Sequence, residues 1–497
     1  MSDSIIKVTN IKKYFGGVRA LDGVDIDIKK GEIHCLAGEN GCGKSTLINV
    51  ISGFYTPNHG EIEIDGVAYS KLTPKQAIAS GIQVIYQDLS VFPNLTVIEN
   101  LALNMELAQG NKFVSKKRMR KIAEEAISKI NFKVDLDELV ENLTVADKQL
   151  IAISRALLYD AKLIIMDEPT TAITQKEVKA LFSVIKKLQE QNISILFVSH
   201  KLDEVFEIAE RFTVLRNGKN VASGNTNELD QDKFTYYMTG RKIKEEPYIY
   251  VEKKDSKTVL EVKNLSLKNG FDDISFSVKQ GEILGITGLL GSGRTELVES
   301  IFGYNKADSG EIFIGGEKAI INNVRDGIAH GIGYIPPERI MESLFLSQSI
   351  GDNISITQWK ECSNKIGIIN EKEINESVDK WVESLSIKIH SSKDPVRTLS
   401  GGNQQKCVLA KWLAIDLKVL ILNGPTVGVD IGAKFDIYKL IKESAAQGLA
   451  VIIISDDLSE VLTNCNRILV MRQGKLAVEK LPHEVDASEL IALVIAD

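Results

Sequence analysis

The stretch GENGCGKST, Gly38–Thr46, decides the fold class of this chain. It fits the pattern Gly-x-x-x-x-Gly-Lys-Ser/Thr and stands between an apolar run, residues 33–37, and a helix-like run, residues 47–52. In that context the pattern predicts a phosphate-binding loop, because the glycines let backbone amides turn inward and the helix N-terminus adds positive potential. We expect Lys44 to bring its charge to the outer phosphates and Ser45 to hold Mg²⁺. The expected contact residues of the loop are Gly38, Glu39, Asn40, Gly41, Cys42, Gly43, Lys44, Ser45 and Thr46.

The loop belongs to a segment that occurs twice. KKGEIHCLAGENGCGKSTL from Lys29 returns as KQGEILGITGLLGSGRTEL from Lys279, an offset of 250 residues. AKLIIMDEPT from Ala161 returns as LKVLILNGPT from Leu417, an offset of 256 residues. Because several matched segments follow one another in the same order, the chain is a duplication with a small insertion in its second copy.

The repeat predicts two domains, residues 1–240 and 258–497. The segment between them, residues 241–257, is rich in charge, contains Pro247 and lacks helical or strand periodicity, so we expect an exposed linker. Within each copy, short β-branched runs are followed by amphipathic helical stretches. This alternation predicts an α/β core with parallel strands.

The composition is that of a globular protein that folds throughout, with 44% hydrophobic and 26% charged residues. The net charge of −7 argues against broad nucleic-acid binding. The five cysteines show no metal-ligand spacing, and we expect reduced, partly buried thiols. The apolar runs are far shorter than the roughly 20 residues that a membrane-spanning helix needs. No secretory segment is recognisable in residues 1–10, which favours the cytoplasm and leaves membrane contact to a partner.

Four polar side chains follow apolar strands of the first copy. Asp167 and Glu168 come directly after LIIM, where carboxylates are costly unless they serve a cation or a reaction. We expect Asp167 to bind Mg²⁺ and Glu168 to act as a base on the attacking water. Gln87 and His200 follow two other strands; Gln87 is placed to contact metal and water, and His200 the γ-phosphate. Alone, each of these two is more often an ordinary strand-end residue, but their order behind the phosphate loop favours a catalytic role.

These motifs, together with LSGGNQQK from Leu399, resemble those of ABC-type nucleotide-binding domains, and the tandem arrangement resembles the ATP-binding proteins of bacterial monosaccharide importers. The resemblance covers nearly the whole chain. It implies in each copy a RecA-like core, an antiparallel β subdomain and a helical subdomain. It also implies ATP and Mg²⁺ as ligands, integral-membrane permease subunits as partners, and a solute-binding protein that acts through the permease. The expected location is the cytoplasmic side of the membrane, with no nucleic acid bound.

The same resemblance implies two ATP sites, each shared between the phosphate loop of one domain and the signature segment of the other. The first site would combine Phe15, stacked on adenine, with Lys44, Ser45, Gln87, Asp167, Glu168, His200 and the signature residues Ser400, Gly401 and Gly402. Every expected part of this site is present. The stacking role of Phe15 is weighed about evenly against plain packing at a strand end.

The second site is altered at almost every position. Arg294 replaces the lysine, Pro337 the glutamine, Asn423 and Gly424 the two carboxylates, and Asp456 the histidine. The signature segment facing it, LTVAD from Leu143, lacks both glycines and brings in a carboxylate. We therefore predict one hydrolytic site and one silent site; whether nucleotide binds in the second stays open at this stage.

Two other functions compete with import. A soluble tandem ATPase acting on ribosomes or nucleic acid would be expected to carry a long basic linker or zinc-binding cysteines, and a nucleotide sensor without turnover would not need Glu168 and His200. SVFPNLTVIENL, from Ser90, is the expected permease contact, with plain packing as its alternative. The sequence does not separate one sugar or related solute from another, nor one copy per complex from two.

Overall fold

The computed structural model describes residues 3–108, 114–171, 173–243, 248–250 and 257–495. By its contacts the chain divides into two compact units, Met1–Ile243 and Lys244–Asp497. Of the predicted linker, residues 244–247 and 251–256 lie outside the described residues. Tyr248, within that segment, donates a hydrogen bond from its hydroxyl to the carbonyl of Gly281 at 3.1 Å. Each unit is described below by itself.

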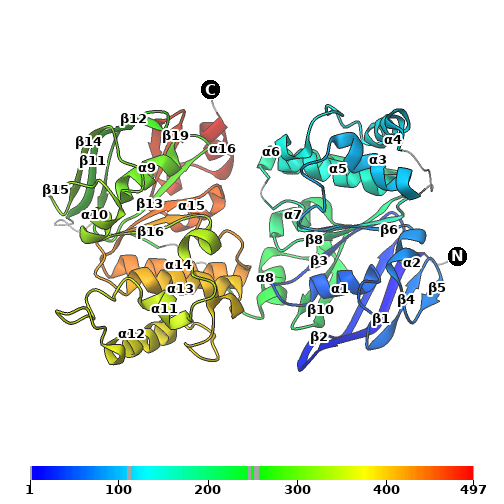
Figure 1. The fold of residues 1–497 in the computed structure, drawn as a ribbon, viewed down its shortest axis with the longest axis horizontal. Helices are drawn as coiled ribbons and strands as arrows, with labels where there is room; N and C mark the ends of the chain where they lie inside the picture. Colours follow the sequence, from blue (N-terminus) through cyan, green and yellow to red (C-terminus); the bar gives the residue numbers. More distant parts are fainter. Residues whose placement is uncertain (1–2, 109–113, 172, 244–247, 251–256, 496–497) are drawn as a thin grey trace. The chain divides into compact units, whose positions relative to one another are not determined.

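The first unit contains two sheets (Figure 1). The antiparallel sheet has the order β2 (Val18–Lys29), β1 (Ser4–Phe15), β4 (His59–Ile64) and β5 (Val67–Tyr69). The other sheet has the order β10 (Lys219–Asn225), β9 (Arg211–Arg216), β3 (Ile33–Ala37), β8 (Ser194–Val198), β7 (Leu163–Asp167) and β6 (Ile82–Ile85). From β9 to β6 its strands are parallel, and only β10 runs antiparallel to its neighbour.

The helices of the first unit fill the connections between strands. They are α1 (Lys44–Ile51), α2 (Pro74–Ala79), α3 (Val97–Ala108), α4 (Lys116–Ser128), α5 (Val145–Leu157), α6 (Gln175–Glu190), α7 (Leu202–Ile208) and α8 (Gln231–Thr239), with short 3₁₀ turns at Val140–Asn142 and Thr226–Glu228. Figure 1 shows α3, α4 and α5 gathered as a helical group, which has its own buried cluster that includes Val97, Leu101 and Val140. This group is the predicted helical subdomain.

The second unit repeats this order. Its antiparallel sheet contains β12 (Phe271–Lys279), β11 (Thr258–Leu267), β14 (Ser309–Ile314) and β15 (Glu317–Ala319). Its mainly parallel sheet contains β16 (Ile332–Ile335), β17 (Val419–Asn423), β18 (Ala450–Ile454), β13 (Ile283–Gly288), β19 (Arg467–Arg472) and β20 (Lys475–Lys480). The helices are α9 (Arg294–Phe302), α10 (Val324–Ala329), α11 (Ile350–Ser355), α12 (Glu371–Ser384), α13 (Gly401–Leu413), α14 (Ile431–Ala446), α15 (Leu458–Asn464) and α16 (Ala487–Ile495), with a π-helical turn at Arg339–Ser343 and 3₁₀ turns at Val396–Thr398 and Pro482–Glu484. The predicted α/β class, with an antiparallel and a helical subdomain in each copy, is confirmed.

Burial follows from the sequence pattern. All five residues of β3 are buried, as are all five of β8, which is expected for central parallel strands covered on both faces. One apolar cluster joins Ile6 of the antiparallel sheet, Leu47 of α1 and Leu163 of the parallel sheet. The phosphate loop therefore leaves a rigid central strand and enters a helix that is packed between two sheets.

Only part of the stretch predicted to contact a permease is exposed. Phe92 is 51% exposed and Pro93 is exposed too, but Leu95 is only partly exposed, and Val97 and Ile98 are buried in α3. The apolar residues from Val97 onward therefore form the core of the helical subdomain and offer no outer surface. The exposed residues of this stretch are Ser90 and residues 92–94.

Candidate functional site

The predicted catalytic residues of the first unit lie at one edge of the parallel sheet. The strands β3, β8, β7 and β6 are neighbours in that order. Because they are parallel, their carboxyl ends share an edge, where ligands bind in open α/β sheets. These ends lead into the phosphate loop, His200, the pair Asp167 and Glu168, and Gln87 respectively.

The phosphate loop has the backbone that its function requires. Gly43 has a φ of 112°, and a Cβ atom there would come within 2.7 Å of the carbonyl oxygen of Ala20, so only glycine fits. The Lys44 side chain is buried and donates hydrogen bonds to the carbonyls of Gly38 at 2.6 Å and Glu39 at 3.1 Å. No side chain caps the N-terminus of α1, so its first amides point at the loop without a side-chain acceptor. A helix N-terminus with free amides of this kind can bind an anion.

The two adjacent carboxylates differ in their surroundings. Burial, reinforced by the charge of Glu168, raises the pKa of Asp167 to about 6, against the opposing effects of Lys44 and a hydrogen bond from Ser45. Burial also raises the pKa of Glu168, but the hydrogen bond and charge of His200, together with the charges of Lys44 and Lys201, outweigh burial and lower the pKa. Glu168 has a φ of 47°, which is unusual for a residue other than glycine. Such local strain is typical of functional positions.

His200 and Glu168 form a direct pair. The imidazole Nδ1 lies 2.9 Å from Oε1 of Glu168. Because an ionised carboxylate can only accept, Nδ1 carries the proton of this hydrogen bond. Both side chains keep some exposure, 19% for His200 and 15% for Glu168, so the pair is reachable from solvent. His200, which was predicted to act near the phosphates, thus has Glu168 as a hydrogen-bond partner.

Gln87 and Asp167 line one hollow of about 780 Å³. Among the described residues, no cluster of three or more His, Cys, Asp or Glu side chains could hold a metal ion by itself. Mg²⁺ does not need one, since it is usually held by one or two carboxylates together with substrate phosphates and water. The oxygen donors of Ser45, Gln87 and Asp167, one of them a largely buried carboxylate, fit this requirement. The hollow is lined by Asn49, Phe54, Tyr86, Gln87, Asp88, Ser90 and Asp167.

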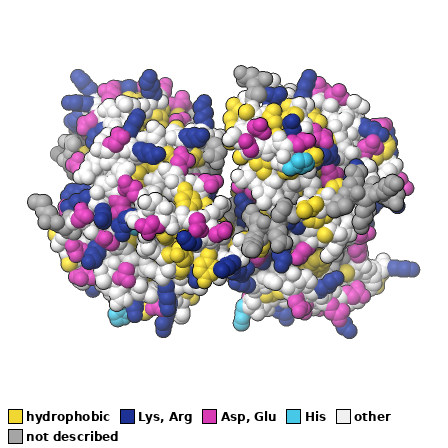
Figure 2. Space-filling view, turned by 180° about the vertical axis from the view of Figure 1, so that it is seen from behind, with side chains coloured by type: hydrophobic (Ala, Val, Ile, Leu, Met, Phe, Trp, Pro, Cys, Tyr) yellow, Lys and Arg dark blue, Asp and Glu magenta, His cyan; other side chains and the backbone are white. Residues whose placement is uncertain are grey.

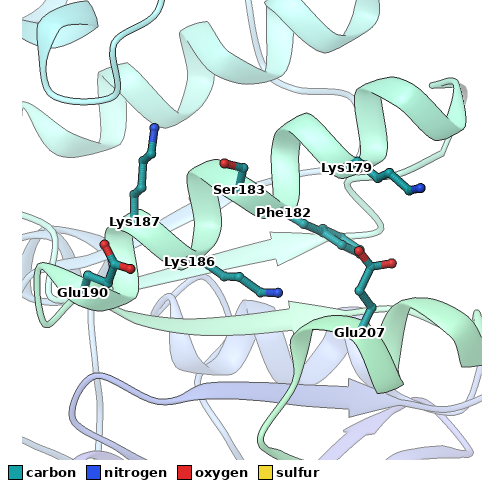
Figure 3. A pocket seen from close by; sticks show the side chains of 7 residues that line it. All are labelled: Lys179, Phe182, Ser183, Lys186, Lys187, Glu190 and Glu207. Carbon is teal, nitrogen blue, oxygen red and sulfur yellow. The ribbon is translucent and has the colours of Figure 1, made fainter.

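A second hollow lies on the outer surface of α6. It measures about 330 Å³ and is lined by six residues of α6 and by Glu207 of α7, which are labelled in Figure 3. Its lining includes three lysines but none of the predicted site residues. We assign it no role in the chemistry.

Phe15 ends β1 and is 40% exposed. Its ring makes an edge contact with Tyr55, at a centroid distance of 5.1 Å, and the Lys13 ammonium lies 5.2 Å from its centroid. Among the described contacts none joins Phe15 to the phosphate loop. Its stacking on adenine therefore stays a prediction.

The two signature segments differ at their helix N-termini. Ser400 precedes α13 and makes no side-chain capping bond, so the amides of this helix start have no side-chain acceptor. Gly402 packs so closely on α14 that a Cβ would lie 2.5 Å from the Cβ of Ala433. In the first unit, Thr144 caps α5 by accepting from the amide of Asp147, whose carboxylate accepts from the Thr144 hydroxyl at 2.9 Å. That helix start is satisfied internally and carries a negative charge.

The loop of the second unit has nearly the same backbone conformation as the phosphate loop of the first unit, but its cationic side chain is bound to a carboxylate. Gly288, Gly291 and Gly293 have φ values of 156°, 79° and 90°, close to their counterparts in the first unit. Arg294 is buried and donates to the carbonyl of Gly288 at 2.7 Å. It also forms an ion pair with Asp456, the residue that replaces His200. The charge that the substitution preserves is therefore paired within the unit.

Neutral contacts are found in the second unit where the first unit has its predicted metal ligands. The amide of Asn423 lies 3.5 Å from the hydroxyls of both Thr295 and Tyr334. Glu299 stands where Asn49 lines the hollow of the first unit, and burial together with the carboxylates of Glu296 and Glu342 raises its pKa. The second unit thus lacks the carboxylate pair at this strand end, and Glu299 is the carboxylate whose pKa is raised nearby.

One part of the site was not recognised from the sequence. Glu204, on α7, is buried and its Oε2 accepts a hydrogen bond from the Ser199 hydroxyl at 2.7 Å. Ser455 and Glu460 make the same bond at 2.7 Å in the second unit. The signal in the sequence was a serine five residues before a glutamate in both copies.

Comparison with known proteins gives consistent matches. The family model described as "ABC transporter" matches residues 21–171 and 271–427. The chain is 42% identical to the ribose import ATP-binding protein RbsA of Clostridium tetani, over 99% of this chain and 97% of that protein. It is 40% identical to the protein of that name from Bacillus subtilis, over 98% and 99%. A putative ribose/galactose/methyl galactoside import ATP-binding protein of Geobacillus kaustophilus is 39% identical, over 99% and 97%.

Proposed function

The chain belongs to the ABC transporter family, and we propose that it is the ATP-hydrolysing subunit of an importer that takes up a monosaccharide or similar small solute through a partner permease. The near full-length similarity to ribose import ATP-binding proteins supports the cargo class. The observation that carries the catalytic assignment is the Glu168–His200 pair, which stands at the same sheet edge as Asp167 and the phosphate loop.

In the first unit, we propose that the loop residues 38–46 bind the phosphates of ATP. Lys44 exchanges its hydrogen bonds with the loop carbonyls for bonds to phosphate oxygens, which are stronger because both partners are charged. Phe15 is proposed to stack on the adenine. The uncapped start of α13, with Ser400, Gly401 and Gly402, is proposed to donate amides to the terminal phosphate.

We propose that Ser45, Gln87 and Asp167 hold Mg²⁺. Mg²⁺ held by these residues would supply positive charge that neutralises the charge developing on the phosphate oxygens. Asp167 must be ionised to serve as a ligand. Because its pKa is raised to about 6, neighbouring positive charge favours the ionised form that can bind a cation.

Hydrolysis then depends on Glu168 and His200. An Oε atom of Glu168 accepts a hydrogen bond from the attacking water and takes its proton, while His200 holds the carboxylate through Nδ1. Loss of a positioned base commonly costs about 10² to 10⁴ in rate. The second unit lacks both groups, so its site is proposed to be silent.

Partner contact is proposed at two exposed loops. The backbone of Phe92 is held by the buried Asn100, which accepts from its amide at 2.8 Å and donates to its carbonyl at 2.9 Å. Asn353 holds Phe345 in the same way, at 2.8 and 3.1 Å. A fixed backbone that presents an exposed aromatic ring suits an apolar partner surface. We propose that permease subunits dock here, which places the chain at the cytoplasmic face of the membrane.

No helix among the described residues is long and apolar enough to cross a membrane. On the face drawn in Figure 2, Lys and Arg side chains are interspersed with Asp and Glu in both units. A mixed surface and a net charge of −7 do not favour a clamp on nucleic acid or ribosomes.

The test is affinity purification of the full chain from gently solubilised membranes, followed by uptake assays. We expect a polytopic permease to co-purify and labelled ribose, galactose or xylose to enter proteoliposomes only when ATP and a solute-binding protein are supplied. Co-purification with ribosomes or nucleic acid in place of a permease would contradict the proposal.

A further inference from the structure

We propose that Glu204 is a positioning residue for ATP hydrolysis, which acts by fixing the turn that carries His200. The inference rests on the proposed roles of Glu168 and His200. Glu204 itself touches neither of them in the described contacts. Its effect is exerted through Ser199 and Lys201, the two neighbours of His200 in the chain.

The turn is held at several points. Oε2 of Glu204 accepts from the Ser199 hydroxyl at 2.7 Å, and the Ser199 hydroxyl oxygen accepts from the amide of Lys201 at 3.1 Å. The Lys201 ammonium lies 3.0 Å from Oε1 of Glu204. Ser199 and Lys201, on either side of His200 in the chain, are thus both bound to Glu204 and to each other. The side chain of His200 contacts Glu168.

The same turn is tied to the segment that carries the base. The Lys201 ammonium donates to the Thr170 carbonyl at 3.3 Å, and the amide of Glu168 donates to the carbonyl of Val198 at 3.0 Å. Two strand ends, those of β7 and β8, are thus joined on both sides of the Glu168–His200 pair. A misplacement of about 1 Å at such a pair can cost on the order of 10² in rate.

Burial makes the tether stiff. The Glu204 side chain is only 8% exposed, and a carboxylate in that position is costly unless it is paired and hydrogen-bonded. Releasing the turn would leave that carboxylate without its partners. Movement of the turn that carries His200 therefore costs free energy.

The duplication supplies a matched control. Glu460 accepts from Ser455 at 2.7 Å and pairs with Lys434 at 2.8 Å, so it is as firmly held as Glu204. The turn that it fixes carries Asp456, which has no catalytic partner, since Gly424 occupies the position equivalent to Glu168. A purely structural contribution should be similar for the two glutamates, whereas a contribution through His200 exists only for Glu204.

The experiment compares Glu204→Gln with Glu460→Gln in the full-length chain, measuring steady-state phosphate release and the affinity for a fluorescent ATP analogue. We expect kcat to fall about tenfold for Glu204→Gln with KM and nucleotide affinity within about twofold of the parent, and Glu460→Gln to keep the parent kcat. Added to His200→Ala, Glu204→Gln should lower kcat by less than about twofold, because the two residues act through one step.

Three results would overturn the proposal: a parent-like kcat for Glu204→Gln, an equal loss for Glu460→Gln, or a full additional loss in the His200→Ala background. If Glu204→Gln unfolds, Ser199→Ala against Ser455→Ala asks the same question from the other partner. These outcomes differ from a failure of the proposed function, in which the parent chain itself would not hydrolyse ATP.

Discussion

The Nδ1 atom of His200 lies 2.9 Å from Oε1 of Glu168 in the first unit. At the equivalent positions of the second unit stand Asp456 and Gly424. Gly424 offers no base, and Asp456 pairs with Arg294. One duplicated framework therefore carries a carboxylate–imidazole pair in one copy and a charge-paired phosphate loop in the other. The following predictions use this difference.

The first prediction concerns the number of nucleotides bound. Asp456 occupies the positive group that would meet a phosphate, and Asn423 cannot replace a charged metal ligand. Because the Asp456 side chain is 77% exposed, solvent screens the ion pair and its contribution to stability is small. The ion pair affects nucleotide binding because it neutralises the charge of Arg294. We expect equilibrium dialysis with MgATP to saturate at one nucleotide per chain.

Matched loop variants locate that nucleotide. Lys44→Ala should weaken binding about tenfold or more, because it removes a charge-assisted hydrogen bond. Arg294→Ala should change the affinity by less than about twofold. Two nucleotides bound per parent chain, or equal losses from the two variants, would show that the second loop binds nucleotide as well.

The second prediction concerns Mg²⁺. Ser45 is hydrogen-bonded to Asp167, whereas Thr295 faces the neutral amide of Asn423. Ser45→Ala should raise the Mg²⁺ concentration needed for half-maximal ATPase activity by about tenfold, as expected when one ligand of a hard cation is lost. Thr295→Ala should leave it unchanged. A Mg²⁺ titration of phosphate release decides between them, and equal shifts would argue against the assignment.

The third prediction concerns transport coupling. Phe92→Asp places a charge on the exposed loop and leaves the two hydrogen bonds between Asn100 and Phe92 in place, because both involve the backbone of Phe92. ATP-driven solute uptake in proteoliposomes should fall about tenfold while basal ATPase activity stays within about twofold, since a desolvated charge disrupts an apolar contact. Val67→Asp, at an exposed position of β5, is the control. Unchanged uptake for Phe92→Asp would remove this loop from the docking surface.

Much of this site was predictable because its signals are local. The glycine spacing in residues 38–46 predicts the backbone of a phosphate-binding loop. The apolar run before Asp167 and Glu168 likewise identifies them as residues at a strand end. Parallel strands then bring these ends to one edge. Side-chain contacts between residues far apart in the sequence were not predictable. Arg294 and Asp456 are 162 residues apart, and no local pattern around either residue indicates that they form an ion pair.

Burial also decided what sequence patterns left open. Glu204 looks like a charged residue on the outer face of a short helix, but it turns inward to Ser199. Val97 and Ile98 belong to the stretch predicted as a docking surface, with plain packing as the alternative, and both are buried in the core of the helical subdomain. In both cases tertiary contacts, which a single sequence does not display, selected the outcome.

The measurement that tests the asymmetry most directly is steady-state phosphate release by Glu168→Gln set against Asn423→Ala. Asn423 is the better control, because Gly424 has a φ of 61° and any side chain there would be strained. We predict that Glu168→Gln lowers the rate by about 10² or more and retains bound ATP, while Asn423→Ala stays within about twofold of the parent. Comparable losses from the two variants would contradict the assignment of hydrolysis to the first unit.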